Sequence, residues 1–235
     1  PSQSITSTIA IAAAVTPTST SAATSLIGVS DASFTTVNAS SITGGTNKTV
    51  DLTARWSYTG DWGHVATAFA SNQYRVQDAS SQRSARGYQA GLTGSFKLGD
   101  PGRLVYGLFS GDGGGRYLWG SLLQGAVDTG STISKFKSNA YHAAYTHQWT
   151  PTLRTNIGYS AMTFQDNPNA VANFHNKRLT QAFINVFAGV APNTELGVEL
   201  VDGRRTLMLP AVDATANPLG NSAGREQRLN MVVRT

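Results

Sequence analysis

The residues of this sequence that could support a function are its basic residues. Several occur singly, inside segments in which apolar and polar side chains alternate. Rings of Arg or Lys favour anions in a water-filled pore. The alternative for each residue is that it pairs with a nearby carboxylate, such as Asp51 or Glu226, and only neutralises the lining. The alternation leaves the direction of Arg103 and Arg178 open. The candidate pore-lining residues are Arg55, Lys97, Arg103, Arg116, Arg154, Arg178, Arg228, Arg234, Glu195 and Glu199.

Catalytic and metal-binding arrangements are poorly supported. His142 falls on the same side of a segment as Ser138 and near Ser160, but a hydrolase also requires a third group that orients the base. The glycine-rich segment 111–116 lacks the Lys-Ser/Thr pair of a phosphate-binding loop. The chain has no cysteine, which excludes disulfides and Cys-based zinc sites. We therefore predict no enzyme activity, no cofactor and no metal site. The histidines considered are His64, His142, His147 and His175.

The elements that must position these residues are segments that alternate apolar with polar side chains. In one of them Val50, Leu52 and Trp56 share one side, and Asp51 and Arg55 share the other. Strict alternation of this kind is typical of a strand with one polar face. The predicted strands are 5–15, 49–58, 63–76, 86–98, 103–110, 135–148, 153–164, 178–189, 194–202 and 225–235.

Short and long connections between these strands follow one another in strict turn. A soluble β-sandwich has no reason to keep all its tight turns at one end, whereas a transmembrane barrel has tight periplasmic turns and larger extracellular loops. We therefore predict an all-β, transmembrane, antiparallel up-and-down β-barrel with about ten strands in this chain and both chain ends on the periplasmic side. Long connections are expected at 77–85, 111–134, 165–177 and 202–224. Aromatic residues flank the short turns, as in an interfacial girdle; they are Trp56, Tyr58, Trp62, Phe96, Tyr145 and Trp149.

The composition fits this interpretation. Charged residues make up 13% of the chain, hydrophobic residues 40%, and the mean hydropathy is −0.18. A barrel with a wet lumen averages its two faces in this way. The net charge is +5, but the basic residues do not cluster, which argues against nucleic acid. The chain begins at Pro1 without an initiator Met or a signal segment, so we expect a processed chain or a fragment.

The expected organisation is a single barrel domain over residues 1–235. Residues 16–48 would form a long extracellular loop or an insertion, and 111–134 and 202–224 would form long extracellular loops. The loop at 111–134 carries Arg116, Tyr117 and Trp119. It could fold into the pore or pack on a neighbouring subunit, and the sequence leaves both possibilities open.

Several stretches resemble the DcaP-like trimeric porins of Gram-negative bacteria. They are residues 51–56 with 60–65, the Gly87-Tyr88-Gln89-Ala90-Gly91 segment, Gly115-Arg116-Tyr117, and 195–199 followed by Gly203-Arg204-Arg205. The similarity covers about residues 49 to 235. It implies a sixteen-stranded trimeric barrel that passes small anionic solutes such as dicarboxylates. This chain has strands for only about ten, which matches the C-terminal portion of such a porin, and it ends at Thr235 rather than at an aromatic residue.

The sequence therefore predicts an integral protein of the bacterial outer membrane. We expect a porin for passive diffusion of small polar solutes, with anionic, dicarboxylate-like ones preferred. Its expected partners are outer-membrane lipid, lipopolysaccharide and two further copies of itself in a homotrimer, with no nucleic acid. The alternative is a non-conducting outer-membrane barrel that acts as an adhesion or scaffold protein through its long loops.

Overall fold

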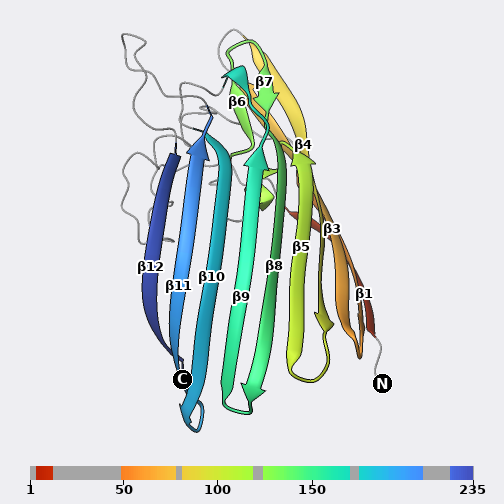
Figure 1. The fold of residues 1–235 in the computed structure, drawn as a ribbon. Coiled ribbons are helices and arrows are strands. Elements are labelled where there is room, and N and C mark those ends of the chain that lie inside the picture. Colours follow the sequence, from red (N-terminus) through yellow and green to blue (C-terminus); the bar gives the residue numbers. More distant parts are fainter. Residues whose placement is uncertain are drawn as a thin grey trace.

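The structure, a computed structural model, is all-β. It describes the backbone of residues 4–12 together with residues 49–77, 81–118, 124–169, 175–208 and 223–234, apart from the side chain of Arg116. The expected insertion at 16–48 lies outside these residues. Ten strands form one sheet in the order β1-β2-β3-β4-β5-β8-β9-β10-β11-β12. Figure 1 shows this sheet as a curved wall whose strands run side by side in chain order.

Every pair of neighbouring strands in this sheet is antiparallel. The prediction of an antiparallel all-β fold is confirmed. The sheet does not close on itself within the described residues, so the size of a barrel is not fixed by it. The ten strands are β1 (Ser4–Ala12), β2 (Asp51–Gly60), β3 (Gly63–Gln77), β4 (Gln82–Lys97), β5 (Gly102–Asp112), β8 (Lys137–Thr150), β9 (Leu153–Phe164), β10 (Asn176–Ala191), β11 (Thr194–Leu207) and β12 (Ala223–Arg234).

The tight turns gather at one end of the sheet, as the sequence predicts. Figure 1 shows them at the bottom of the view, where β1 also begins and β12 ends, while the strand ends that join the longer connections lie at the top. Asn193 in the β10–β11 turn and Gly99 in the β4–β5 turn have positive φ angles of 60° and 73°. These residue types adopt that conformation more readily than other residues.

The long-connection end contains more regular structure than expected. β3 and β4 stay paired as far as Gln77 and Gln82, so most of the expected loop at 77–85 belongs to a two-stranded ribbon. β11 likewise continues to Leu207, five positions beyond the predicted end at 202. These extensions carry polar residues on both sides, which removes the alternation that marks a strand in the sequence.

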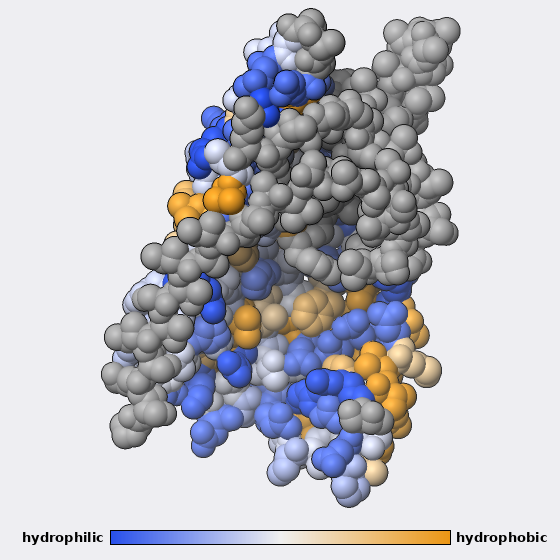
Figure 2. Space-filling model, turned by 180° about the vertical axis from the view of Figure 1, so that it is seen from behind, coloured by the Kyte–Doolittle hydropathy of each residue, from blue (hydrophilic) through white to orange (hydrophobic). Residues whose placement is uncertain are grey.

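Apolar side chains cover the face of the sheet that we call the outer face. Paired residues in neighbouring strands share a face, and one row across β8 to β11 consists of Tyr145, Ile157, Ile184 and Leu200. Ile157 is 53% exposed and Leu200 is 51% exposed. A soluble protein would bury a continuous apolar surface of this kind. The opposite, inner face is hollowed, and Figure 2 shows mainly hydrophilic residues in its uncovered part, with hydrophobic residues at the margin.

Aromatic side chains pack against one another beside the tight turns. The ring centroids of Trp62 and Phe96 are 5.3 Å apart, and those of Phe96 and Tyr106 are also 5.3 Å apart. Near the β8–β9 turn, the rings of His147 and Trp149 lie 4.1 Å apart. Amphipathic rings at one level of a membrane-facing sheet are typical of an interfacial girdle.

A small apolar cluster lies at the opposite end, among the long connections. It consists of the buried side chains of Val127, Phe136, Phe164 and Met208. The connection between β5 and β8 supplies part of it through a hairpin of β6 (Ala126–Asp128) and β7 (Ile133–Lys135). The sequence predicts a loop over 111–134 and does not indicate this hairpin, because its three-residue strands are too short to show a period.

Candidate functional site on the inner face

A hydrogen-bonded belt of polar side chains crosses the inner face from β8 to β12. Thr146 donates to Asn156 over 2.6 Å, and Asn156 donates to Asn185 over 2.5 Å. Asn185 then donates to Oε2 of Glu199 over 3.0 Å, and Asn230 donates to Oε1 of the same carboxylate over 3.1 Å. These residues are direct cross-strand partners, so the register of four neighbouring strand pairs produces the belt. We call these five residues the polar belt.

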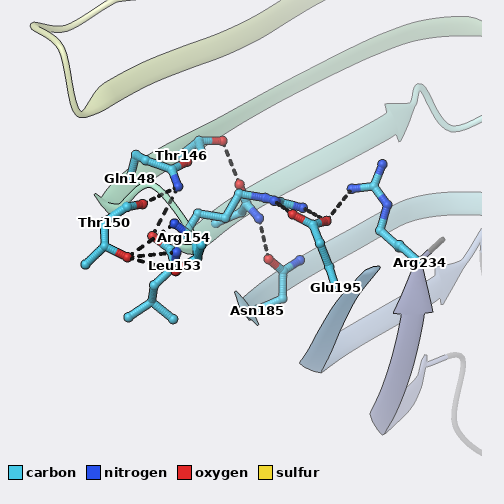
Figure 3. Close-up of polar contacts among 10 residues, drawn as sticks. Thr146, Gln148, Thr150, Leu153, Arg154, Asn185, Glu195 and Arg234 are labelled. Atoms are coloured by element: carbon cyan, nitrogen blue, oxygen red, sulfur yellow. Dashed lines mark hydrogen bonds and ion pairs between the residues drawn. The ribbon is translucent and has the colours of Figure 1, made fainter. Parts of the chain in front are cut away.

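An ionic cluster lies between the polar belt and the tight turns. The guanidinium of Arg154 on β9 grips both carboxylate oxygens of Glu195 on β11, with a contact of 2.7 Å from Nη2 to Oε2. Arg234 on β12 reaches Oε2 of Glu195 over 3.7 Å. Figure 3 shows the carboxylate of Glu195 held between the two arginines. Arg154 must cross β10 to do this, and it passes over the ring of Phe187, with 4.7 Å between the guanidinium carbon and the ring centroid.

This arginine–glutamate cluster has a net charge of +1, because it contains two arginines and one carboxylate. The side chains of Arg154 and Glu195 are 21% and 30% exposed, and that of Arg234 is 62% exposed. A bidentate arginine–carboxylate pair is geometrically fixed. Arg234 is held less closely and leaves much of its guanidinium accessible to water or to a solute on the inner face.

A second group of cations lies across β4 and β5, also near the tight turns. Lys97 and Arg103 are direct cross-strand partners on the inner face. Arg103 donates to the hydroxyl of Ser95 over 3.0 Å, and that hydroxyl lies 2.9 Å from Nδ1 of His64. Like charges directly opposite one another destabilise a sheet. Their presence here indicates a wet surface that lies open to counter-ions.

The connection after β5 folds back over the inner face. The hydroxyl of Tyr117 in the short 3-10 helix η1 (Gly115–Tyr117) donates to Asp51 of β2 over 2.6 Å. Tyr74 of β3 donates to the carbonyl of Gly113 over 2.6 Å. The segment 113–117 is therefore fixed against β2 and β3. Of the two positions that the sequence left open for this connection, the structure shows the inward one for these residues.

Small inner-face residues leave a recess of about 430 Å³ beneath this inward segment. Ala68, Ala70 and Gly91 form its floor, and larger side chains form its walls. A side chain at position 91 would collide with the ring of Phe109, since an added Cβ would lie 2.7 Å from it. The wall residues are Thr53, Arg55, Gln89, Phe109 and Tyr117.

The structure places most of the predicted lining residues on the inner face. The strand registers put Arg55, Lys97, Arg103, Arg154, Arg228, Arg234, Glu195 and Glu199 there. Arg228 lies 2.9 Å from Glu226, so this arginine has the carboxylate partner that the alternative interpretation expected. Arg178 differs, because it is paired with Thr163 and Thr206 on the outer face. The side chain of Arg116 lies outside the described part of the chain.

Several inner-face residues are not among the predicted lining residues, although the alternation places Asn156 and Asn230 on the polar sides of their strands. They include the asparagines of the polar belt and Arg205, which donates to Asn176 over 2.6 Å near the long connections. The belt follows from which residues of neighbouring strands face each other, and turn lengths alone suggest that register only loosely. Arg205 is separated from Glu199 by an even number of positions, and this spacing in the sequence places both on the same strand face.

No group of three or more metal-ligating side chains occurs among the described residues. His142 packs against Phe109, with ring centroids 6.0 Å apart, and is the cross-strand partner of Ser160. Within the described chain, no helix is long and apolar enough to cross a membrane.

The antiparallel sheet has an exposed apolar outer face, a polar inner face and aromatic rings beside its tight turns. Together these features define the class of protein to which the chain belongs. The chain is a membrane-embedded β protein whose strands contact lipid on one side and water on the other. The family model described as DcaP outer membrane protein matches residues 19–215. The chain therefore belongs to the DcaP outer membrane protein family, and its location in the bacterial outer membrane is confirmed.

A solved structure shows the same fold. The crystal structure of the outer membrane channel DcaP of Acinetobacter baumannii superimposes with a TM-score of 0.69 at 23% sequence identity. The alignment covers 83% of this chain and 54% of that channel, so the chain spans about half of the length of the channel. Among curated proteins, no match was found. The resemblance to DcaP-like porins inferred from the sequence is confirmed.

Proposed function

We propose that the protein forms an outer-membrane channel through which small polar solutes, preferentially anions, diffuse passively. The observation that supports this most directly is the like-charge pair of Lys97 and Arg103, which face each other on the inner face. Such a pair attracts anions from the surrounding water and repels cations. The arginine–glutamate cluster adds a further net positive charge at the same end of the sheet.

Dicarboxylates suit this distribution of charge. The recess under the inward segment contains one guanidinium, that of Arg55, among apolar and neutral polar walls. Lys97, Arg103 and Arg234 provide other cationic positions on the same face. A solute with two carboxylates can be attracted by one cationic group before it leaves another, which supports passage without tight binding.

The channel that we propose is a closed, sixteen-stranded barrel in a homotrimer. Two features support closure. β1 and β12 each have a hydrogen-bonded neighbour on one side within the described sheet, and Met231 on β12 is 88% exposed. Open strand edges are unfavourable in lipid, because their backbone groups lack partners. The similar channel is about one and a half times as long as this chain, which leaves length for further strands.

Ion selectivity in planar bilayers tests the proposal. The natural full-length protein would be reconstituted, and the reversal potential measured across a tenfold KCl gradient. We expect stable conductance steps and a reversal potential displaced toward the chloride equilibrium value. The double variant Lys97→Gln/Arg103→Gln should move it toward the potassium value.

The matched control is Lys137→Gln/Lys177→Gln, which removes two cations near the long connections. This control should leave the reversal potential within error of the wild-type value. Conductance that shows cation preference would refute anion selectivity. A well-folded protein that conducts no ions would refute the channel and favour the adhesion or scaffold alternative.

A further inference from the structure

The outer face of β10, β11 and β12 carries a group of arginines where an apolar surface would be expected. Arg204 and Arg225 are direct cross-strand partners there, and Arg178 lies on the same face one step further along β10. Their side chains lie near the strand ends that join the long connections. In a membrane β protein this is the extracellular side of the lipid-facing surface.

One carboxylate accompanies these arginines on the outer face. Asp202 lies 2.5 Å from Arg225 and 3.4 Å from Arg204, and Gln227 donates to it over 3.2 Å. Three arginines and one aspartate leave a net charge of +2. The side chains of Arg204 and Arg225 remain 60% and 53% exposed, so their guanidinium groups can still bind an anion.

An apolar groove of about 500 Å³ leads away from Asp202 across the outer face. Ala143 and Ala182 leave space between larger side chains, because the cross-strand row alternates small residues with Tyr159. The groove is continuous with the rest of the lipid-facing surface. The larger side chains that line it are Leu104, Tyr145, Tyr159, Ile157, Ile184 and Leu200.

We infer that this groove and the arginines above it form a binding site for a phosphorylated lipid of the outer leaflet. An acyl chain would lie along Ala143 and Ala182, and the headgroup phosphate would bind Arg204 and Arg225, with Arg178 beside them. Planar guanidinium groups bind phosphate through paired hydrogen bonds. Charged side chains on the lipid-facing surface are tolerated near the interface, where they reach the headgroups. This site does not depend on whether the protein conducts ions.

Lipid titration of the natural full-length protein in a neutral detergent tests the inference. Native mass spectrometry would follow the binding of diphosphoryl lipid A, and of the same lipid with both phosphates removed. We expect the dephosphorylated lipid to bind at least about tenfold more weakly, because charge-assisted hydrogen bonds are lost. Inorganic phosphate alone, which lacks acyl chains, should not compete at millimolar concentration.

Variants separate the two parts of the site. Arg178→Gln/Arg204→Gln/Arg225→Gln should weaken the diphosphoryl lipid by at least about tenfold and leave the dephosphorylated lipid unchanged. The same three changes to Lys should retain part of the affinity. Ala182→Phe fills the groove and should weaken both lipids. Arg228→Gln, on the inner face of β12, removes one charge from the opposite side and should change neither.

Three results would overturn the inference. Equal binding of both lipids to the wild-type protein would exclude phosphate recognition. Unchanged affinity in both the Gln triple variant and Ala182→Phe would place the lipid elsewhere. A change of oligomeric state on Ala182→Phe in lipid-free detergent would show that another copy of the chain covers this face. Far-UV circular dichroism would verify the fold of each variant, and the Ala182→Phe and Lys variants test the site if the Gln triple variant does not fold.

Discussion

Replacing Glu195 by Gln should make the proposed channel more selective for anions. The carboxylate lies between Arg154 and Arg234, so its loss raises the net charge of this cluster from +1 to +2. Gln has nearly the same shape and can still accept a hydrogen bond from Arg154. The pair is partly exposed to water, so the loss of stability should be small.

The expected size of the selectivity change follows from Coulomb's law. One added charge about 7 Å from a permeating ion in water contributes about 0.6 kcal/mol, and screening in 0.1 M salt reduces this to about 0.3 kcal/mol. The energy has opposite sign for chloride and potassium. Their permeability ratio should therefore change by a factor of about two to three.

Reversal potentials in planar bilayers measure this ratio directly. The shift should shrink at 1 M salt, where the Debye length is about 3 Å. Asp100→Asn, in the β4–β5 tight turn, removes one carboxylate away from the inner face and serves as the control. An unchanged ratio for Glu195→Gln at 0.1 M salt, or a change toward potassium, would refute the placement of this cluster in the conducting path.

Three further predictions concern the polar belt, the inward segment and the buried histidine. Glu199→Gln should lower the free energy of unfolding in urea by about 1–3 kcal/mol, because one of two asparagine donors loses its carboxylate acceptor. Tyr117→Phe removes the hydrogen bond to Asp51 and should raise single-channel conductance or its noise by loosening the inward segment. Burial lowers the pKa of His175 to about 4, so the protein should lose stability as the pH falls from about 6.5 toward 4.

The sign of the histidine effect follows from proton binding. Above pH 6.5 His175 is neutral in both the folded and unfolded states, so it adds no pH dependence. Below that pH the unfolded chain binds a proton that the folded chain excludes, and the loss approaches about 3 kcal/mol near pH 4. Urea unfolding from pH 7.5 to 4 measures it. His175→Phe should remove this part of the pH dependence, and an unchanged slope in that variant would contradict the assignment.

Two of these tests have a matched control variant. Glu226→Gln removes an inner-face carboxylate outside the polar belt and should affect the free energy of unfolding less than Glu199→Gln does. Tyr141→Phe removes a tyrosine hydroxyl from the outer face and should leave conductance unchanged. Equal effects of the paired variants would mean that neither the polar belt nor the inward segment has the role assigned to it.

The strands and their faces could be predicted from the sequence because membrane strands obey a simple period. Leu196, Val198 and Leu200 alternate with Glu195 and Glu199, and the structure places the two sets on opposite faces. The same parity would have placed Arg178 with Ile184 on the outer face. That arginine lies near the strand end, next to a register irregularity between Asn176 and Arg178, where the alternation is weakest.

Contacts that skip a strand could not be predicted in this way. Arg154 and Glu195 belong to β9 and β11, and β10 lies between them. Their contact requires a long side chain and a flat surface over which it can extend, which the ring of Phe187 provides. Gly197 in turn leaves room for that ring, since an added Cβ there would lie 2.5 Å from it. The alternation within single strands and the pairing of neighbouring strands do not reveal the contact between Arg154 and Glu195.

The two glutamates of β11 show what the structure adds to the sequence. Glu195 and Glu199 have the same type, face and strand, so alternation alone treats them as equivalent candidates for the lining. In the structure Glu195 joins two arginines, and its main consequence is electrostatic. Glu199 accepts one hydrogen bond from each side of the polar belt, and both donors point toward it. A neutral amide has a single acceptor oxygen and cannot replace both interactions. The first glutamate therefore lowers the positive charge of the inner face, and the second links β10 to β12 across β11.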